Sequence, residues 1–181
     1  MQSYSADVIK RLCELGARPP IIHSYFRGVA PKEIRAIYKE IQGKSAVRGQ
    51  LPLVTDLYFT YQRAVRVSLV AKVFVDHRAA GASEAESLIS AYEMLLSMFP
   101  DRPDLTISQV WHISRCVEIG RFYLRNCEEG HTYVASQDYA VTTHQCPVCK
   151  EMIKLDRTLA RQEKQIRRNP QAEKKRKCTR Q

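Results

Sequence analysis

The sequence lacks the long hydrophobic run that a membrane protein requires. A membrane-spanning helix needs about 18–20 consecutive apolar residues, and the apolar stretch Val65–Val75 is interrupted by Arg66 and Lys72. The first residues, MQSYSADVIKRL, also lack the continuous apolar segment of a secretory leader. We therefore predict a cytoplasmic protein with no membrane partner.

Motifs for catalysis are missing as well. The chain contains no GxGxxG, P-loop or GxSxG pattern. A zinc deaminase would need an H-x-E sequence, but His131 is followed by Thr132 and Tyr133. The sequence therefore predicts that the protein is not an enzyme.

The chain has six cysteines, and three of them lie in one short region. Cys127 and His131 form a Cys-x3-His pair, Cys146 and Cys149 form a Cys-x2-Cys pair, and 14 residues separate the two pairs. Thiolates and imidazole in two close pairs suit a tetrahedral zinc ion. Four protein ligands would leave no coordination position for a substrate, so we predict a structural zinc site.

Two alternatives for this cluster stay open from the sequence. His144 is also close to the second pair and could replace His131 as the fourth ligand. The CPVC sequence could instead be a redox dithiol, but such a motif normally follows a strand and opens a helix in a βαβ context. The residues before Cys127 have helical patterns, which argues against the dithiol. Cys13 and Cys116 lie within those patterns, and we expect them to be buried apolar side chains.

Helical periodicity extends through the first two thirds of the chain. Capping boxes at Ser83–Glu86 and Thr106–Gln109 predict two helix starts, and Thr55 or Asp56 is the expected cap of a long helix. We expect helices over residues 6–15, 21–26, 31–42, 56–80, 84–99, 107–126 and 152–166. Short β-branched and aromatic segments at 132–134 and 139–143 predict a hairpin between two metal-binding turns.

This pattern predicts a mainly α fold, with a helical body followed by a small zinc-ribbon-like C-terminal module and a basic tail. We expect a helical, partner-binding domain over 1–126, a zinc-binding module over 127–156 and a basic, partly disordered tail over 157–181.

The positive charge is concentrated at the C-terminal end. Residues 157–181 hold 10 Lys or Arg and 2 Glu, so this segment carries most of the formal net charge of +10. Such a density of cations is typical of proteins that bind nucleic acid phosphates. The alternatives are a solubilising extension or a membrane-surface anchor, but the apolar side of the segment is thin. The predicted DNA contacts are Arg157, Arg161, Lys164, Arg167 and Arg168.

A second basic surface is predicted on the helix over 31–42. Lys32, Arg35 and Lys39 fall on the side opposite its apolar residues, although charged residues there are usually only solvated. This helix follows a short helix and a Gly-containing turn, so residues 21–42 have the outline of a helix-turn-helix. We therefore include Lys32, Arg35 and Lys39 as secondary candidates for DNA contact.

The chain resembles FlhC, the larger subunit of the FlhD–FlhC type of bacterial transcription activator, over about residues 8–150. The matching residues are scattered but in register. They are LGAR at 15–18, IYKE at 37–40 with Gly43, Gly49, Leu51, Pro52, Asp56, Phe59, Trp111, Arg115, Val117, Glu118 and Gly120.

The resemblance implies a mainly helical fold that ends in a zinc site. It also implies a hetero-oligomer with an FlhD-like subunit, binding to double-stranded promoter DNA, and recruitment of RNA polymerase at flagellar or conjugative-transfer promoters. For the metal, the resemblance implies a site formed by four cysteines in two pairs. Here Gly130 stands where the second cysteine of the first pair would be, so His131 substitutes for it.

Two other functions are compatible with the sequence. A zinc-containing protein-interaction adaptor without direct DNA contact would use the same helices and metal site. An RNA-binding regulator is less favoured, because no aromatic-rich platform for stacking unpaired bases is evident.

Overall fold

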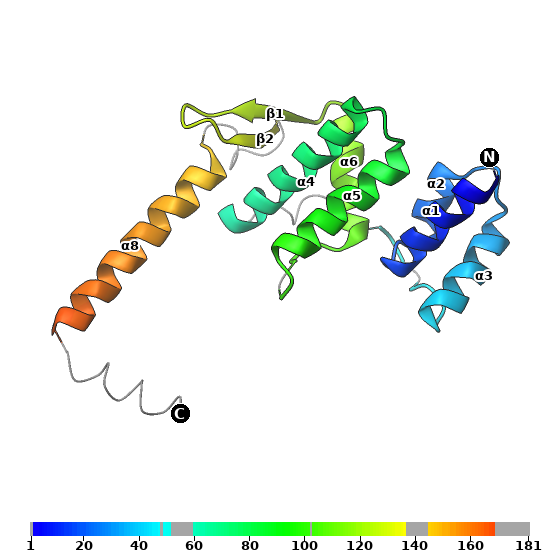
Figure 1. Cartoon of the computed structure of the whole chain (residues 1–181), viewed down its shortest axis with the longest axis horizontal. Coiled ribbons are helices and arrows are strands. Elements are labelled where there is room, and N and C mark those ends of the chain that lie inside the picture. Colours follow the sequence, from blue (N-terminus) through cyan, green and yellow to red (C-terminus); the bar gives the residue numbers. More distant parts are fainter. Residues whose placement is uncertain (1, 48, 52–59, 102, 137–144, 169–181) are drawn as a thin grey trace.

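The computed structural model describes residues 2–47, 49–51, 60–101, 103–136 and 145–168 (Figure 1). Helices make up most of this part, and a two-stranded antiparallel sheet precedes the last helix. The predicted fold class, a helical body followed by a small Cys/His-containing C-terminal module, is therefore confirmed. No helix of the described part is both long enough and apolar enough to cross a membrane.

The first three helices pack together at one end of the molecule. They are α1 (Gln2–Glu14), α2 (Pro19–Tyr25) and α3 (Pro31–Gln42). The prediction for 31–42 is confirmed, because Pro31 opens α3 and Gly43 ends it with a left-handed φ of 67°. The Gln42 amide donates a hydrogen bond of 2.7 Å to the Cys13 carbonyl, which ties the end of α3 to α1.

The next three helices form the centre of the body. They are α4 (Tyr61–Ala79), α5 (Glu84–Met98) and α6 (Ile107–Glu118). Both predicted capping boxes, at Ser83 and at Thr106, are present. Helix α4 begins under a Thr60 cap that accepts a hydrogen bond from the Arg63 amide. The expected caps Thr55 and Asp56 lie outside the described residues.

The predicted extension of the sixth helix to Asn126 is wrong. Helix α6 ends at Glu118, and Gly120 follows with a left-handed φ of 73°. Residues Phe122–Asn126 form the strand β1 instead. Leu124 is seven residues after Val117, so it continues the helical pattern, yet it equally suits the inward side of a strand that begins at Phe122.

The predicted hairpin has a different partner strand. Strand β2 (Thr132–Ser136) pairs antiparallel with β1, so that Phe122 faces Ser136 and Asn126 faces Thr132. The turn of this hairpin therefore contains Cys127 and His131. The expected strand over 139–143 lies outside the described residues.

The last helix, α8 (Pro147–Arg168), begins five residues earlier than position 152, where we expected it. Proline is favoured in the first turn, where its missing N–H is not needed. In Figure 1, α8 extends away from the body, at the end of the molecule opposite α1–α3.

A single apolar core connects the body to the hairpin. It runs from α1 through α6 and includes Phe122 of β1 and Val134 of β2. Cys13 and Cys116 are buried in it, as predicted. A second, smaller cluster, centred on Tyr133, Ala135 and Cys146, lies beside the Cys/His residues.

Candidate metal centre and cationic helix

The hairpin turn positions the first pair of candidate ligands. The Cys127 amide donates to the His131 carbonyl at 3.0 Å, and the Gly130 amide donates to the Cys127 carbonyl at 3.0 Å. Gly130 has a left-handed φ of 78°, a conformation that costs residues with a Cβ atom about 1–2 kcal/mol. This closed turn places the Cys127 thiol and the His131 ring on the same side of the hairpin.

The start of α8 positions the second pair. The Lys150 amide donates to the Cys146 carbonyl at 3.2 Å, so Cys146 precedes the helix and Cys149 lies in its first turn. The unpaired N–H groups at a helix N-terminus stabilise nearby negative charge, including thiolates. The local backbone therefore favours the anionic form in which cysteine binds metal.

The four side chains converge on one point. The Cys127 sulfur lies 3.8 Å from that of Cys149, and the His131 Nδ1 lies 3.5 Å and 3.3 Å from these two sulfurs. With Cys146, all four ligand atoms lie within 4.8 Å of one another. Around a zinc ion with usual bond lengths, tetrahedral ligands are about 3.8 Å apart for two sulfurs and about 3.5 Å for sulfur and nitrogen. The cluster could therefore hold a metal ion.

A disulfide does not account for this arrangement. Its two sulfurs would be about 2.05 Å apart, and all three cysteines of the cluster are unbridged. The CPVC sequence does open a helix, as a redox dithiol would, but Cys127 and His131 complete a four-ligand set around it. His144, the alternative ligand, lies outside the described residues.

Crowding of the sulfurs changes their acidity. Burial alone would raise the pKa of Cys127, but hydrogen bonds from the backbone and side chain of His131 and from Cys146 lower it to about 7. Burial and the neighbouring Cys146 and Cys127 sulfurs both disfavour the thiolate of Cys149, and together they raise its pKa to about 12. A divalent cation between the sulfurs would stabilise all three thiolates at once.

A buried serine joins this module to the body, and our sequence reasoning missed it. The Ser68 hydroxyl of α4 accepts a 3.0 Å hydrogen bond from the Val134 amide of β2 and donates one of 2.7 Å to the Ala64 carbonyl. The hint in the sequence was a polar residue beside buried Val67 in an otherwise apolar helical stretch. Ser68 therefore sets where the hairpin, and with it the first ligand pair, lies on α4.

The predicted DNA contacts of the tail fall mostly on α8. Arg157 and Arg161 are exposed. At 100° per residue, positions 164 and 168 share their face of the helix, whereas position 167 does not. Lys150 and Lys154 extend this face toward the metal cluster, and Lys154 also lies over the Tyr61 ring of α4, 5.6 Å from its centre. We call the face made by these six positions, 150, 154, 157, 161, 164 and 168, the cationic stripe.

The second predicted basic surface lies elsewhere. Lys32, Arg35 and Lys39 are exposed on α3, opposite the buried Ile34 and Tyr38. Figure 1 shows α3 and α8 at opposite ends of the molecule. The structure therefore does not bring the two sets of cations onto one surface within a single chain.

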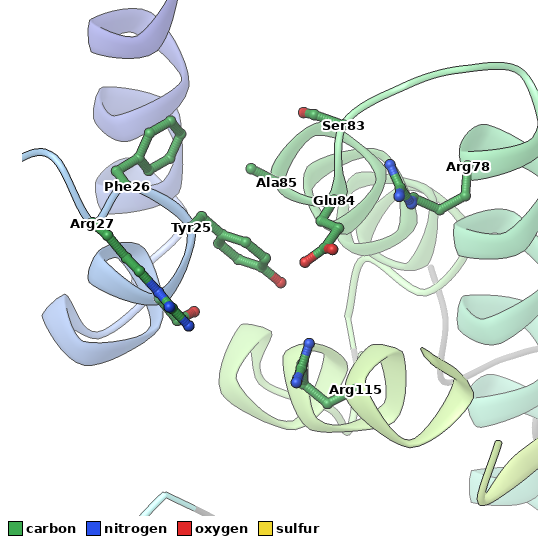
Figure 2. Close-up of a pocket in the computed structure, with 9 residues that line it drawn as sticks. Tyr25, Phe26, Arg27, Arg78, Ser83, Glu84, Ala85 and Arg115 are labelled. Carbon is green, nitrogen blue, oxygen red and sulfur yellow. The ribbon is translucent and has the colours of Figure 1, made fainter. Parts of the chain in front are cut away.

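A cleft of about 570 Å³ lies between the α2–α3 connection and helices α4 to α6 (Figure 2). Arg27, Arg78, Arg115 and Glu84 line it. Tyr25 reaches into this charged group, and burial, together with the carboxylates of Glu118 and Glu84, raises its pKa.

Two of the three arginines that line this cleft have partners on the protein. Arg115 pairs with Glu118 at 2.8 Å, and Arg78 donates to the Ala82 carbonyl. Most of the arginines of the cleft are therefore already engaged, and we assign the cleft no ligand.

Comparisons with known proteins place the chain among transcriptional regulators. Residues 3–162 match the family described as Flagellar transcriptional activator (FlhC). The chain is 26% identical over 145 residues to the flagellar transcriptional regulator FlhC of Yersinia enterocolitica, covering 77% of this chain and 75% of that protein. The corresponding protein of Xenorhabdus nematophila is 27% identical over 146 residues, covering 77% and 75%. That of Thauera aminoaromatica is 28% identical over 152 residues, covering 80% and 77%.

Proposed function

This chain belongs to the FlhC family of flagellar transcriptional activators, and on that basis we propose that it is the DNA-binding subunit of a hetero-oligomeric activator. Its partners would be an FlhD-like subunit, double-stranded promoter DNA and RNA polymerase, at flagellar or conjugative-transfer promoters. Such a protein acts in the cytoplasm. The prediction that the chain is not an enzyme agrees with a family of transcriptional regulators.

The observation that carries this proposal is that one helix, α8, holds both a candidate metal ligand, Cys149, and the cations. Cys149 lies in the first turn of α8, and Arg157 and Arg161 follow two and three turns later on the same rigid element. A metal that anchors the start of α8 therefore also sets the direction of the cationic stripe. Lys and Arg side chains on phosphates supply affinity and register, whereas sequence choice needs contacts to base edges.

We assign zinc to the cluster from its donor set. Three thiolates and an imidazole at tetrahedral spacing match structural zinc. Cys127, His131, Cys146 and Cys149 would hold the ion, which supplies no reaction step and only fixes the hairpin turn against α8. The absence of the family's second cysteine is compensated by His131, whose Nδ1 lies among the sulfurs.

The competing function is a zinc-containing adaptor that contacts only protein. It is compatible with the same metal cluster, but it leaves the segregation of cations on one side of α8 without a purpose. Direct DNA contact explains this segregation, because a straight row of cations can follow the phosphates of a duplex.

The salt dependence of DNA binding tests the proposal. We expect the affinity for a mixed-sequence duplex to fall as salt rises, and the double variant Arg157→Gln with Arg161→Gln to lower the log–log slope by about 2, since each phosphate contact contributes about 0.9. The matched control, Lys10→Gln with Lys44→Gln, removes two exposed cations that are not among the predicted DNA contacts, and it should leave the slope unchanged. An unchanged slope for the α8 variant in fluorescence anisotropy titrations would favour the adaptor.

A further inference from the structure

The side of α8 opposite its cations is apolar and uncovered. Met152, Leu155 and Leu159 are 55%, 63% and 50% exposed, and their spacing of three and four residues puts them on one face. Helix α8 extends away from the body (Figure 1). Within the described part of the chain, these three side chains therefore project into solvent. Large apolar side chains gathered on one face of an exposed helix mark an interaction surface.

Most large apolar residues of α8 follow a seven-residue repeat, and Ile153, 45% exposed, lies beside it. With Met152 at position a, the inner positions a and d between 148 and 166 are Val148, Met152, Leu155, Leu159, Gln162 and Ile166. Five of these six residues are apolar, and Val148 at the start also packs against the cluster of Tyr133, Ala135 and Cys146. A repeat of this kind predicts packing against another helix rather than against a sheet or a loop. We call these six positions the apolar seam.

The charged residues of α8 are sorted around the apolar seam. Its carboxylates fall at the flanking positions e and g, at Glu151, Asp156 and Glu163. Its cations fall at positions b, c and f, at Lys150, Lys154, Arg157, Arg161, Lys164, Arg167 and Arg168. Residues at e and g lie beside the partner helix and decide which partner is accepted. The edges of the seam are therefore acidic although the helix as a whole is strongly basic, and of these carboxylates Glu151 already pairs with Lys154 at 3.1 Å.

This charge pattern distinguishes between possible occupants. A second copy of α8 would place carboxylates opposite carboxylates in either orientation, because a parallel pair matches g with e, and an antiparallel pair matches e with e and g with g. A helix with Lys or Arg at its flanking positions would meet opposite charges instead. We propose that the apolar seam binds an amphipathic helix of a partner protein whose flanking positions are lysine or arginine. The seam and the cationic stripe lie on opposite faces of α8. The partner helix can therefore bind whether or not DNA is bound.

Two designed peptides test the proposal with the full-length, metal-loaded protein. Both have about three heptads with Leu at a and d; one has Lys at e and g, and the other has Glu there. We expect the Lys peptide to bind about tenfold or more tightly than the Glu peptide in fluorescence anisotropy titrations. The formal net charge of the chain is +10, so nonspecific attraction favours the Glu peptide and cannot produce this preference.

A pair of neighbouring substitutions locates the binding face. Leu159→Glu places a carboxylate in the seam and should weaken binding of the Lys peptide about tenfold, whereas Ala160→Glu, one position off the seam, should change it less than about twofold. Both residues are exposed, so circular dichroism should show that both variants fold normally.

Equal binding of the two peptides, preference for the Glu peptide, or insensitivity to Leu159→Glu would overturn the proposal. Self-association of the protein in sedimentation equilibrium that Leu159→Glu abolishes would also overturn it, and would assign the apolar seam to a second copy of this chain.

Discussion

The helical body and the metal-binding module differ in what can stabilise them. The body buries large side chains from each of its helices, including Leu12, Ile34, Phe74, Leu88 and Ile113. The buried cluster of the module contains only Tyr133, Ala135 and Cys146. A cluster of this size cannot offset the entropy of ordering a hairpin turn and a helix start. The comparison shows that apolar burial can maintain the body, whereas the hairpin turn and the start of α8 would gain most of their stability from the proposed metal.

Substituting a metal ligand should have the largest effect, because it should unfold the metal-binding module while the helical body stays folded. We expect Cys146→Ser to reduce bound zinc from about one ion per chain to nearly none, because structural zinc sites supply about 10–16 kcal/mol of apparent binding energy to local folding. Elemental analysis of purified protein would measure the zinc. Hydrogen exchange should then show the hairpin turn and the start of α8 unprotected and α4 to α6 still protected.

The control for this variant is Cys116→Ala, which removes a thiol that is buried in the body. It should retain the metal while lowering the melting temperature modestly. Full zinc content in Cys146→Ser, or simultaneous loss of protection in α5, would contradict the separation of the two regions.

Removing the hydrogen bond between Ser68 of α4 and Val134 of β2 should reduce stability by an intermediate amount. Ser68→Ala leaves the buried Val134 amide without its acceptor, which should cost about 1–3 kcal/mol of unfolding free energy. Chemical denaturation would measure this loss.

Ser87→Ala is a matched control for Ser68→Ala. Ser87 is also buried on a helix and also donates to a carbonyl four residues earlier, but no hydrogen bond from the hairpin is lost with it. Equal destabilisation by the two variants would show that the contact between Ser68 and Val134 contributes nothing of its own.

The smallest effect is expected from a substitution in the hairpin turn, which should weaken metal binding only slightly. Gly130→Ala forces a residue with a Cβ atom into the left-handed region, although the space around it is open. The cost of about 1 kcal/mol corresponds to about fivefold weaker metal binding, which competition with a chromophoric chelator would measure. Gly28→Ala, at a glycine with equally open surroundings and no left-handed φ, should leave metal affinity unchanged.

Local patterns in the sequence were sufficient for most helices of the body. Both capping boxes and the Pro31-to-Gly43 helix depend on residues within one or two turns of each other, so their prediction needed no tertiary information. The end of α6 could not be predicted in this way, because Leu124 satisfies both the helical and the strand period. Pairing of β1 with β2 decided the matter, since the strand conformation gains a row of hydrogen bonds and places Phe122 in the core.

The sequence by itself determined the chemistry of this protein: which four side chains could hold a metal, where the cations are concentrated, and which helices have an apolar face. These properties depend on residue type and short spacing alone. Only the tertiary structure decided that Cys127 and His131 lie in one hairpin turn, that Ser68 attaches this hairpin to α4, and that α8 leaves the body with Met152, Leu155 and Leu159 exposed. The attachment at Ser68 joins residues 66 positions apart, and the hairpin depends on β1 pairing with β2 instead of continuing α6, so neither follows from residue type and short spacing alone.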